Sequence, residues 1–157
     1  MNPRIGQGFD VHRWSDDPDR PLVLGGVVLP GERGLAGHSD ADVVAHAVAD
    51  ALLGAAGLGD IGGHFPDTDS RWRGADSLTL LAHVVGLVRD EGWSVGNVDT
   101  TVILETPKLT PHKAAMEERL SGVVGAAVSV KAKRAEGLGA LGRGEGVACL
   151  AVALLFR

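Results

Sequence analysis

Apolar and polar residues recur over residues 40–56 with the period of a helix. The positions that can face a core are Val43, Val44, Ala47, Val48, Ala51 and Leu52. Three polar residues, Asp42, His46 and Asp50, lie four apart and form a stripe on the other side. We predict a helix over about 40–56, with Ser39 as its N-cap and Asp42 completing a capping box. His46 on this stripe is either a surface residue or a ligand.

The same approach predicts the remaining elements, with a period of two for strands and 3.6 for helices. Helices are predicted at 77–90, capped by Asp76 or Ser77, and from Pro111 at N1 to about Leu120. Strands are predicted at 4–12, 93–105, 127–134 and 146–156, with a tight hairpin at 22–29 that turns at Gly25-Gly26. The order is therefore strand, hairpin, two helices, strand, helix and two strands.

Glycines at 137, 139 and 142 match the G-x-G-x-x-G spacing of dinucleotide sites. The segment leads into a predicted strand and not into a helix, so we reject a dinucleotide site. We predict a hairpin between the two flanking strands instead. Because hairpins imply antiparallel pairs and helices are interspersed, the predicted class is α+β: a mixed β-sheet with helices on one face plus a small hairpin. Without an internal repeat or linker, residues 1–157 form a single domain.

Composition excludes several classes of function but does not identify one. Hydrophobic residues make up 45% of the chain and charged residues 22%, as in an ordinary globular protein. A net charge of −5 argues against a general binder of nucleic acid or anionic membranes. The single cysteine, Cys149, excludes an internal disulfide and suggests a reducing compartment. The longest apolar run, 147–156, is about half the length that a membrane helix needs. We therefore expect a cytoplasmic protein.

Asp10 and His12 are two apart in a predicted strand, so their side chains point to the same side. A carboxylate beside an imidazole suits zinc or a similar divalent cation, although a solvated pair at a strand end is the simpler explanation of so short a motif. His46 is the candidate for a third ligand. Three ligands would leave the fourth position for substrate or water, which is the pattern of catalytic metal sites.

Two further segments suggest a phosphorylated substrate. Residues 57–69 are rich in glycine and aspartate, which can hold a ligand, although a turn capped by its own acids is the better interpretation from sequence alone. A basic cluster at the other end of an acidic chain is a reasonable place for a phosphate, and it consists of Lys131, Lys133, Arg134 and Arg143. Together they suggest a phosphorylated substrate and a second, harder cation.

Seven motifs, in this order along essentially the whole chain, resemble the 2-C-methyl-D-erythritol 2,4-cyclodiphosphate synthase family. They are R-I-G-Q-G-F-D-V-H at 4–12, H-S-D-A-D-V-V-A-H-A at 38–47, D-A-L-L-G-A-A-G-L-G-D-I-G at 50–62, F-P-D-T-D at 65–69, G-A-D-S at 74–77, G-N-V-D at 96–99 and G-R-G-E-G at 142–146. Each motif alone is weak, but the complete ordered set is specific to this family.

The resemblance implies site residues in four groups. Asp10, His12 and His46 would hold Zn²⁺, and His38 and Ser39 would contact the substrate phosphates, with His38 near the transition state. The methylerythritol pocket would be formed by Asp60, Ile61, Gly62, Phe65, Pro66, Asp67, Thr68 and Asp69. The cytidine would be held by Leu104, Glu105, Thr106, Pro107, Lys108, Leu109 and Thr110.

The resemblance also implies that residues 104–110 and 133–136 reach the site from a neighbouring subunit of a homotrimer. Lys133, Arg134, Ala135 and Glu136 would lie beside the diphosphate, with Glu136 on a Mg²⁺ or Mn²⁺ ion. Arg134 stands where the family commonly has a threonine assigned to the transition state. Ala140 stands where an aromatic residue often lines the central cavity of the trimer, and Arg143, which reaches into that cavity, is retained.

The implied reaction is intramolecular. The 2-phosphate of 4-diphosphocytidyl-2-C-methyl-D-erythritol 2-phosphate would attack the β-phosphorus and release CMP, which requires positioning and charge neutralisation more than a covalent nucleophile. A zinc-dependent phosphohydrolase with the same ligands would instead consume water. A trimeric protein that binds zinc and CMP without turnover, or a domain whose histidines are caps and surface residues, are the non-catalytic alternatives.

Overall fold

The computed structural model describes residues 2–157. Within them the main sheet has four strands in the order β1-β6-β4-β5. These strands are β1 (Pro3–Arg13), β6 (Gly146–Phe156), β4 (Ser94–Ile103) and β5 (Ala127–Lys133). Strand β6 pairs antiparallel with both β1 and β4, whereas β4 and β5 are parallel. The predicted mixed sheet is therefore present.

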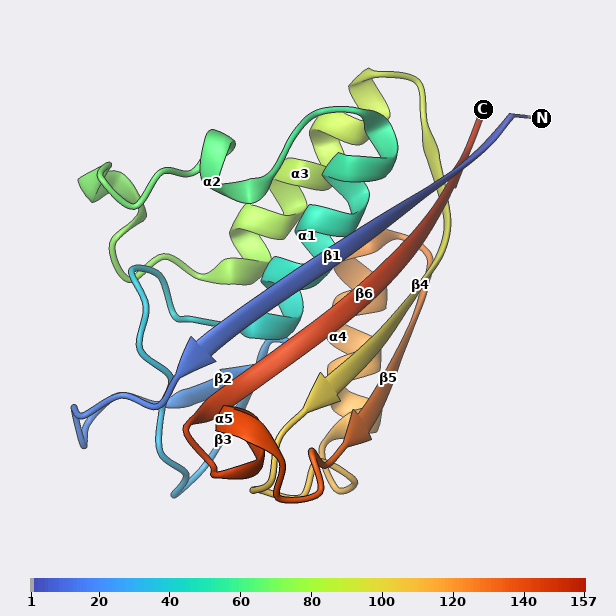
Figure 1. Ribbon diagram of the computed structural model, residues 1–157. Helices are drawn as coiled ribbons and strands as arrows, with labels where there is room; N and C mark the ends of the chain where they lie inside the picture. The colour runs from blue at the N-terminus through green and yellow to red at the C-terminus, as the bar shows by residue number, and fades with distance from the viewer. Residues whose placement is uncertain (1) are drawn as a thin grey trace.

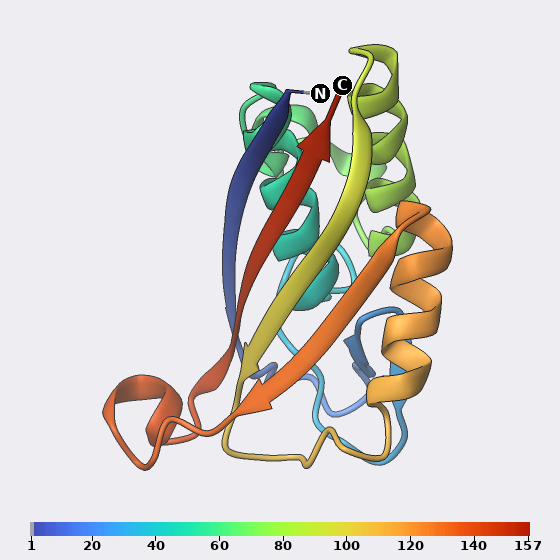
Figure 2. The same cartoon turned by 90° about the vertical axis from the view of Figure 1, so that its right-hand side faces the viewer.

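Three helices cover one face of this sheet (Figures 1 and 2): α1 (Val43–Ala56), α3 (Ser77–Asp90) and α4 (Lys113–Val124). Helix α4 connects the parallel strands β4 and β5, since parallel neighbours need a crossover. The core fills the space between helices and sheet. The other face of the sheet has no covering element and exposes Ile5, Phe9, Val11 and Val152 within the described residues. None of the helices in this part of the chain is long and apolar enough to cross a membrane.

Strand β1 lies unusually close to α1 because two of its residues have no side chain. A Cβ atom added to Gly6 would lie 2.0 Å from the carbonyl oxygen of Ala51, and one added to Gly8 would lie 1.9 Å from that of Ala47. Real Cβ atoms do not approach a backbone so closely, so these positions require glycine. The close approach brings the end of β1, with Asp10 and His12, against the start of α1.

The N-cap of α1 is Asp42, so the prediction of Ser39 was wrong. Asp42 Oδ1 accepts hydrogen bonds from the backbone N–H groups of Val44 and Ala45, each at 3.1 Å. The helix cannot extend back to residue 40 because Ala41 has a left-handed backbone with φ of 57°. The Ser39 hydroxyl instead accepts from the N–H of Ala41 at 3.3 Å.

The small hairpin is confirmed as β2 (Leu22–Leu24) and β3 (Val27–Leu29). It turns at Gly25 and Gly26, whose φ angles of 58° and 74° fit the left-handed positions of a tight hairpin. Both glycine N–H groups donate to Asp42, to Oδ1 at 2.9 Å and to Oδ2 at 2.7 Å. One carboxylate therefore caps α1 and holds the hairpin turn against it.

The predicted hairpin between the last two strands was also wrong. Strand β4 lies between β5 and β6, so the connection 134–145 crosses the end of β4 and contains the short helix α5 (Gly139–Gly142). Figure 2 shows this connection extending past the end of the sheet. The prediction paired β5 with β6 because they are consecutive strands in the sequence, but β6 forms a long antiparallel pair with β4 instead.

Three smaller differences concern the start of one helix and two short helices. Helix α4 begins at Lys113 and not at Pro111, because residues 109–112 form a turn in which the His112 N–H donates to the Leu109 carbonyl. The loop after α1 contains α2 (Ile61–His64) and the 3₁₀ helix η1 (Ser70–Trp72), neither of which was predicted. Both are too short to produce a helical periodicity.

Candidate metal centre and adjoining pockets

Asp10, His12 and His46 meet between β1 and α1. Asp10 and His12 lie on the helix-covered face of β1, and His46 faces them from the first turns of α1. Asp10 Oδ2 lies 2.9 Å from His12 Nε2 and 3.0 Å from His46 Nδ1. All three potential ligand atoms lie within 4.8 Å of one another. The structure therefore brings together three residues that are up to 36 positions apart in the chain.

The spacing of these atoms fits a metal ion. Two ligands of a tetrahedral zinc ion lie about 3.3 Å apart if each bond is about 2 Å long. The observed separations from Asp10 are a few tenths of an ångström shorter, so small side-chain movements would make room for an ion. One carboxylate and two imidazoles are a donor set for zinc or another divalent ion of similar hardness.

Both imidazole rings are oriented by a second hydrogen bond. His12 Nδ1 lies 2.8 Å from the carbonyl oxygen of Ala36, which can only accept, so Nδ1 carries a proton. His46 Nε2 lies 2.8 Å from the hydroxyl of Ser77, the first residue of α3. Each ring thus turns its other nitrogen toward Asp10.

The charges of Asp10 and His12 stabilise each other. Burial raises the pKa of Asp10, but the hydrogen bonds from His12 and His46 and their charges lower it by more, to about 2. Burial lowers the pKa of His12, whereas its hydrogen bond to Asp10 and the charge of that carboxylate raise it, with a net increase. The carboxylate is therefore ionised at neutral pH and favours positive charge beside it, whether from protons or from a cation.

A cavity of about 280 Å³ adjoins the metal ligands and contains many of the predicted residues. Besides His12 and His46, its predicted lining residues are His38, Ser39, Ile61, Gly62, Phe65 and Asp67. His38 Nε2 lies 3.0 Å from the Asp69 carbonyl, which fixes that ring at the cavity wall. Polar groups for phosphate and apolar groups for a carbon skeleton thus line one cavity.

Sequence reasoning missed three residues of this cavity, Gly37, Trp72 and Leu80. Trp72 packs edge-on against Phe65, with ring centroids 4.9 Å apart. The tryptophan had a sequence signal, because it stands in a polar loop of a chain with only 4% aromatic residues. Leu80 had none, since its place in the wall depends on how α3 packs.

The predicted acids of the 60–69 loop have local roles. Asp60 caps α2 by accepting from the Gly63 N–H at 2.9 Å, and Asp69 caps η1 by accepting from the Arg71 N–H at 3.0 Å. Asp69 also pairs with the Arg71 side chain at 2.6 Å. Neither acid lines the cavity, and neither do Pro66 and Thr68. The contacts of these four residues with substrate stay a prediction.

A second cavity, of about 510 Å³, is formed by the loop after β4 and the end of β5. All seven residues predicted to hold the cytidine line it, from Leu104 to Thr110, together with Ala132, Lys133 and Arg134. Glu105 joins the two walls, since Oε2 accepts from the Arg134 guanidinium at 2.9 Å and Oε1 accepts from the Ala135 N–H at 2.8 Å. Arg134 is thus held at this cavity by a carboxylate.

The remaining predicted residues lie beyond the end of the sheet. Ala140 and Ala135 line a shallow apolar hollow of about 480 Å³ with Ile103 and Leu138. Arg143 pairs with Glu145 at 2.6 Å. Glu136 is exposed and has a left-handed backbone with φ of 55°, which is uncommon for a residue other than glycine.

A model of the YgbB family matches residues 3–156 of the sequence. The chain belongs to the YgbB family. A relative from Trichlorobacter lovleyi, named 2-C-methyl-D-erythritol 2,4-cyclodiphosphate synthase, is 56% identical over 155 residues, which cover 97% of this chain and 98% of that protein. A relative of the same name from Symbiobacterium thermophilum is 58% identical over 154 residues, covering 96% and 97%. The family expected from the sequence motifs is confirmed.

Solved structures of YgbB-type proteins share the whole fold. A 2C-methyl-D-erythritol-2,4-cyclodiphosphate synthase in a CDP-bound form superimposes with a TM-score of 0.87 at 40% identity, covering 98% of this chain and 100% of that one. The bifunctional IspDF of Campylobacter jejuni gives a TM-score of 0.93 at 42% identity, covering 98% of this chain and 42% of that longer one. IspF from Plasmodium falciparum, in a CDP complex, gives 0.86 at 33% identity.

In this YgbB-family chain the two candidate regions lie at opposite sides of the sheet. The candidate metal ligands Asp10 and His12 are on β1, one edge strand, whereas the second cavity follows β4 and β5, and β5 is the other edge strand. Strand β6 separates β1 from β4. One copy of the chain therefore does not place the metal ligands and the second cavity side by side.

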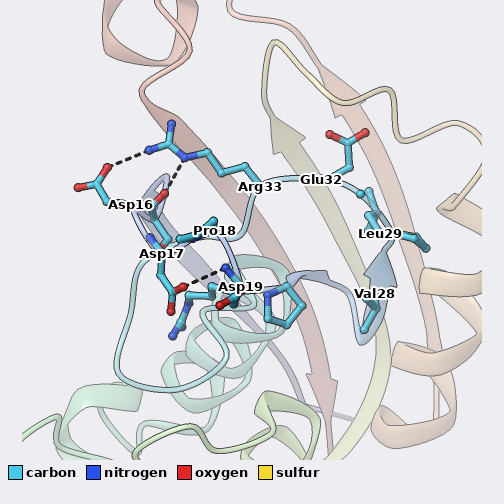
Figure 3. A pocket seen from close by; sticks show the side chains of 13 residues that line it. Asp16, Asp17, Pro18, Asp19, Val28, Leu29, Glu32 and Arg33 are labelled. Atoms are coloured by element: carbon cyan, nitrogen blue, oxygen red, sulfur yellow. Dashed lines mark hydrogen bonds and ion pairs between the residues drawn. The ribbon is translucent and has the colours of Figure 1, made fainter.

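Another hollow, of about 660 Å³, lies between residues 15–21 and 28–33 and contains no predicted site residue (Figure 3). Two of the four acids that line it have partners within these segments. Asp16 pairs with Arg33 at 3.0 Å, and Asp17 accepts from the Asp19 N–H at 2.9 Å. We assign this hollow to loop structure and not to the family's activity.

Proposed function

We propose that this chain converts 4-diphosphocytidyl-2-C-methyl-D-erythritol 2-phosphate to 2-C-methyl-D-erythritol 2,4-cyclodiphosphate with release of CMP, in non-mevalonate isoprenoid biosynthesis. The observation that carries the proposal is the convergence of Asp10, His12 and His46 beside a mixed polar and apolar cavity, in a chain that matches synthases of this name over nearly its whole length. The enzyme class is a metal-dependent lyase, or cyclase.

Asp10, His12 and His46 would hold a zinc ion, and Glu136 would contact a Mg²⁺ or Mn²⁺ ion beside the substrate diphosphate. When bound, the metals supply Lewis acidity and neutralise phosphate charge. The side chains and backbone of the protein would hold the substrate in position. His38 and Ser39 lie just before α1 at the cavity wall, where they can donate hydrogen bonds to phosphate oxygens. Ile61, Gly62 and Phe65 would hold the carbon skeleton against the apolar wall.

The proposed step forms one bond and breaks one. An oxygen of the 2-phosphate attacks the β-phosphorus, and the bond from that phosphorus to the oxygen bridging to the α-phosphate breaks. The electron pair leaves with the bridging oxygen on CMP, so no water is consumed. Such a step depends on holding the two phosphates in line, and the chain needs no covalent nucleophile for it. Buried Cys149 is therefore not assigned a role.

The CDP in two similar solved structures supports a cytidine-containing ligand, and we assign its cytidine to the second cavity because all seven residues from Leu104 to Thr110 line it. We further propose that the protein is a homotrimer in which this cavity, with residues 133–136, completes the metal-containing site of a neighbouring copy. Two observations support that assembly. The two regions lie at opposite edges of one sheet, and the uncovered sheet face exposes Phe9 and Val152, apolar surface that an interface would bury.

Turnover of the cytidylated substrate by wild type and His46→Ala tests the proposal. We expect wild type to form CMP and the cyclic diphosphate in equal amounts, and His46→Ala to lose at least about 100-fold in rate, because one of three metal ligands is gone. His112→Ala is the matched control, since that side chain makes no capping hydrogen bond and lines neither cavity.

The products separate this proposal from its alternatives. In ¹⁸O-labelled water, a cyclase leaves both products unlabelled, whereas a phosphohydrolase places the label in a released phosphate group. Binding of zinc and CMP without formation of free CMP from the substrate would identify a non-catalytic binding protein. Unchanged turnover by His46→Ala would contradict the assignment of the metal ligands.

A further inference from the structure

Ser77 lies between a candidate metal ligand and a carboxylate that is not one. It is the first residue of α3 and only 1% exposed. Its hydroxyl lies 2.8 Å from His46 Nε2 and also donates a hydrogen bond to Asp40 Oδ1. An ionised carboxylate can only accept, so the single hydroxyl proton belongs to the bond with Asp40. Ser77 is then left with lone pairs for His46, and Nε2 must carry a proton.

The direction of this hydrogen-bond chain is fixed by the backbone. Asp40 Oδ2 accepts from the Ser77 N–H at 3.1 Å, and Asp40 Oδ1 accepts from the Asp42 N–H at 3.0 Å. A backbone N–H cannot reverse its role, so both oxygens of Asp40 must remain acceptors. The order from His46 to Ser77 to Asp40 therefore runs one way, from donor to acceptor.

We propose that Asp40 and Ser77 are positioning residues that keep the proton of His46 on Nε2 and so reserve Nδ1 for the metal ion. This inference rests on the metal site of the proposed function. The ring of His12 has the opposite arrangement, since the Ala36 carbonyl holds its Nδ1 proton and Nε2 faces Asp10. The two rings face Asp10 through different nitrogens, Nε2 of His12 and Nδ1 of His46. The acceptor that holds the remaining proton must therefore lie at Nδ1 of His12 and at Nε2 of His46.

Ser39 is a weaker alternative acceptor for the same nitrogen. Its hydroxyl oxygen lies 3.2 Å from His46 Nε2, compared with 2.8 Å for Ser77. In Ser77→Ala, Ser39 would replace the lost acceptor in part. Asp40→Asn is the sharper change, because an amide has one acceptor atom and one donor group. Whichever way it is turned, its NH₂ group meets a backbone N–H donor, that of Ser77 or that of Asp42.

The test measures zinc affinity of the metal-free protein by competition with a chromophoric chelator, independently of turnover. We expect Ser77→Ala and Asp40→Asn to bind zinc about 10- to 100-fold more weakly than wild type, the usual effect of losing a partner of a metal-bound histidine. Ser121→Ala is the matched control, because it removes a helix hydroxyl that accepts from the Val128 N–H at 3.0 Å, far along the chain from the metal ligands. We expect its zinc affinity to equal that of wild type.

Two further measurements separate positioning from general damage. Ser77→Thr keeps a hydroxyl at the same place, and we expect it to bind zinc more tightly than Ser77→Ala. In zinc-loaded wild type, ¹⁵N spectra of the histidine rings should show a proton on Nε2 of His46. Thermal unfolding of the metal-free forms checks that each variant is folded.

The outcomes are distinct. Folded Ser77→Ala and Asp40→Asn that bind zinc as tightly as wild type would overturn the positioning role and leave the proposed function intact. Equal losses in Ser77→Ala and Ser77→Thr would show that packing, and not the hydroxyl, sets the affinity, and would also overturn it. A wild-type protein whose zinc affinity does not depend on His46 would overturn both the metal site and this inference.

Discussion

Asp42 is a fully buried carboxylate that accepts four backbone hydrogen bonds. Two come from the first turn of α1 and two from the hairpin turn at Gly25 and Gly26. Burial raises the pKa of this carboxyl, whereas the backbone N–H donors favour its charged form and offset part of the cost of burying it. Asp42 therefore joins the start of α1 to the hairpin of β2 and β3. It thereby fixes the position of the first turns of α1, from which His46 faces β1.

We expect Asp42→Asn to lower the free energy of unfolding by about 1–3 kcal/mol, the cost of leaving one buried donor without a partner. The amide NH₂ group would replace Oδ2 and face the N–H of Gly26. Urea unfolding of the metal-free protein measures the change. Asp76→Asn is the control, because the Asp76 side chain accepts only from the Leu78 N–H and, at 3.5 Å, from the Thr79 hydroxyl, and asparagine caps a helix equally well. A similar loss in both variants would contradict the bridging role.

At the residue scale the sequence predicted that Asp10, His12 and His46 meet, but not which residues support them. Asp10 and His12 could be paired because alternate residues of a strand share a side. Ser39 and Asp42 are both good cap residues, and the left-handed turn at Ala41 that decides between them leaves no pattern in the sequence. Ser77 acquires its role only because α3 packs beside α1, a tertiary contact that no local spacing encodes.

At the scale of helices and strands, the candidate metal site depends on the contact between β1, which carries Asp10 and His12, and α1, which carries His46. We expect Gly8→Ala to destabilise the protein by about 3 kcal/mol, because the new methyl group would meet the backbone of α1 and overpacking there cannot be relieved by a side-chain rotation. The clash is at the carbonyl of Ala47, next to His46, so zinc affinity should fall as well. Urea unfolding and chelator competition measure the two effects.

Gly86→Ala is the matched control on α3. No atom lies within 4 Å of the Cβ it would add, and its backbone is helical. We expect it to stabilise the protein by about 1 kcal/mol, the difference in helix propensity between alanine and glycine. Unchanged stability and zinc affinity in Gly8→Ala would show that α1 can move away from β1 without disturbing the site.

The long elements were predictable because each extends over enough residues to repeat its pattern. Helix α3 and strand β6 were both predicted with the bounds that the structure has. The short α2, η1 and α5 were missed because three or four residues define no periodicity. The false hairpin arose because nothing local in 134–146 indicates that β4 is inserted between β5 and β6.

The whole molecule has an uncovered sheet face that the proposed trimer would bury. We expect Val152→Asp, at a position 46% exposed on the central strand β6, to shift the protein from trimer to monomer, because it places a charge within an apolar interface. Light scattering after size-exclusion chromatography measures the mass. Val28→Asp, at a position 55% exposed on the hairpin, is the control and should leave the mass unchanged. A wild-type monomer would contradict the assembly.

The separation of the metal ligands and the second cavity onto opposite edges of the sheet has a genetic consequence. If each site draws one half from each of two copies, His46→Ala and Glu136→Ala damage different halves. Trimers assembled at random from equal amounts of the two inactive chains should then have about a quarter of their sites intact, each built from two undamaged halves. Two null alleles expressed together would restore isoprenoid synthesis to a cell that neither could support alone.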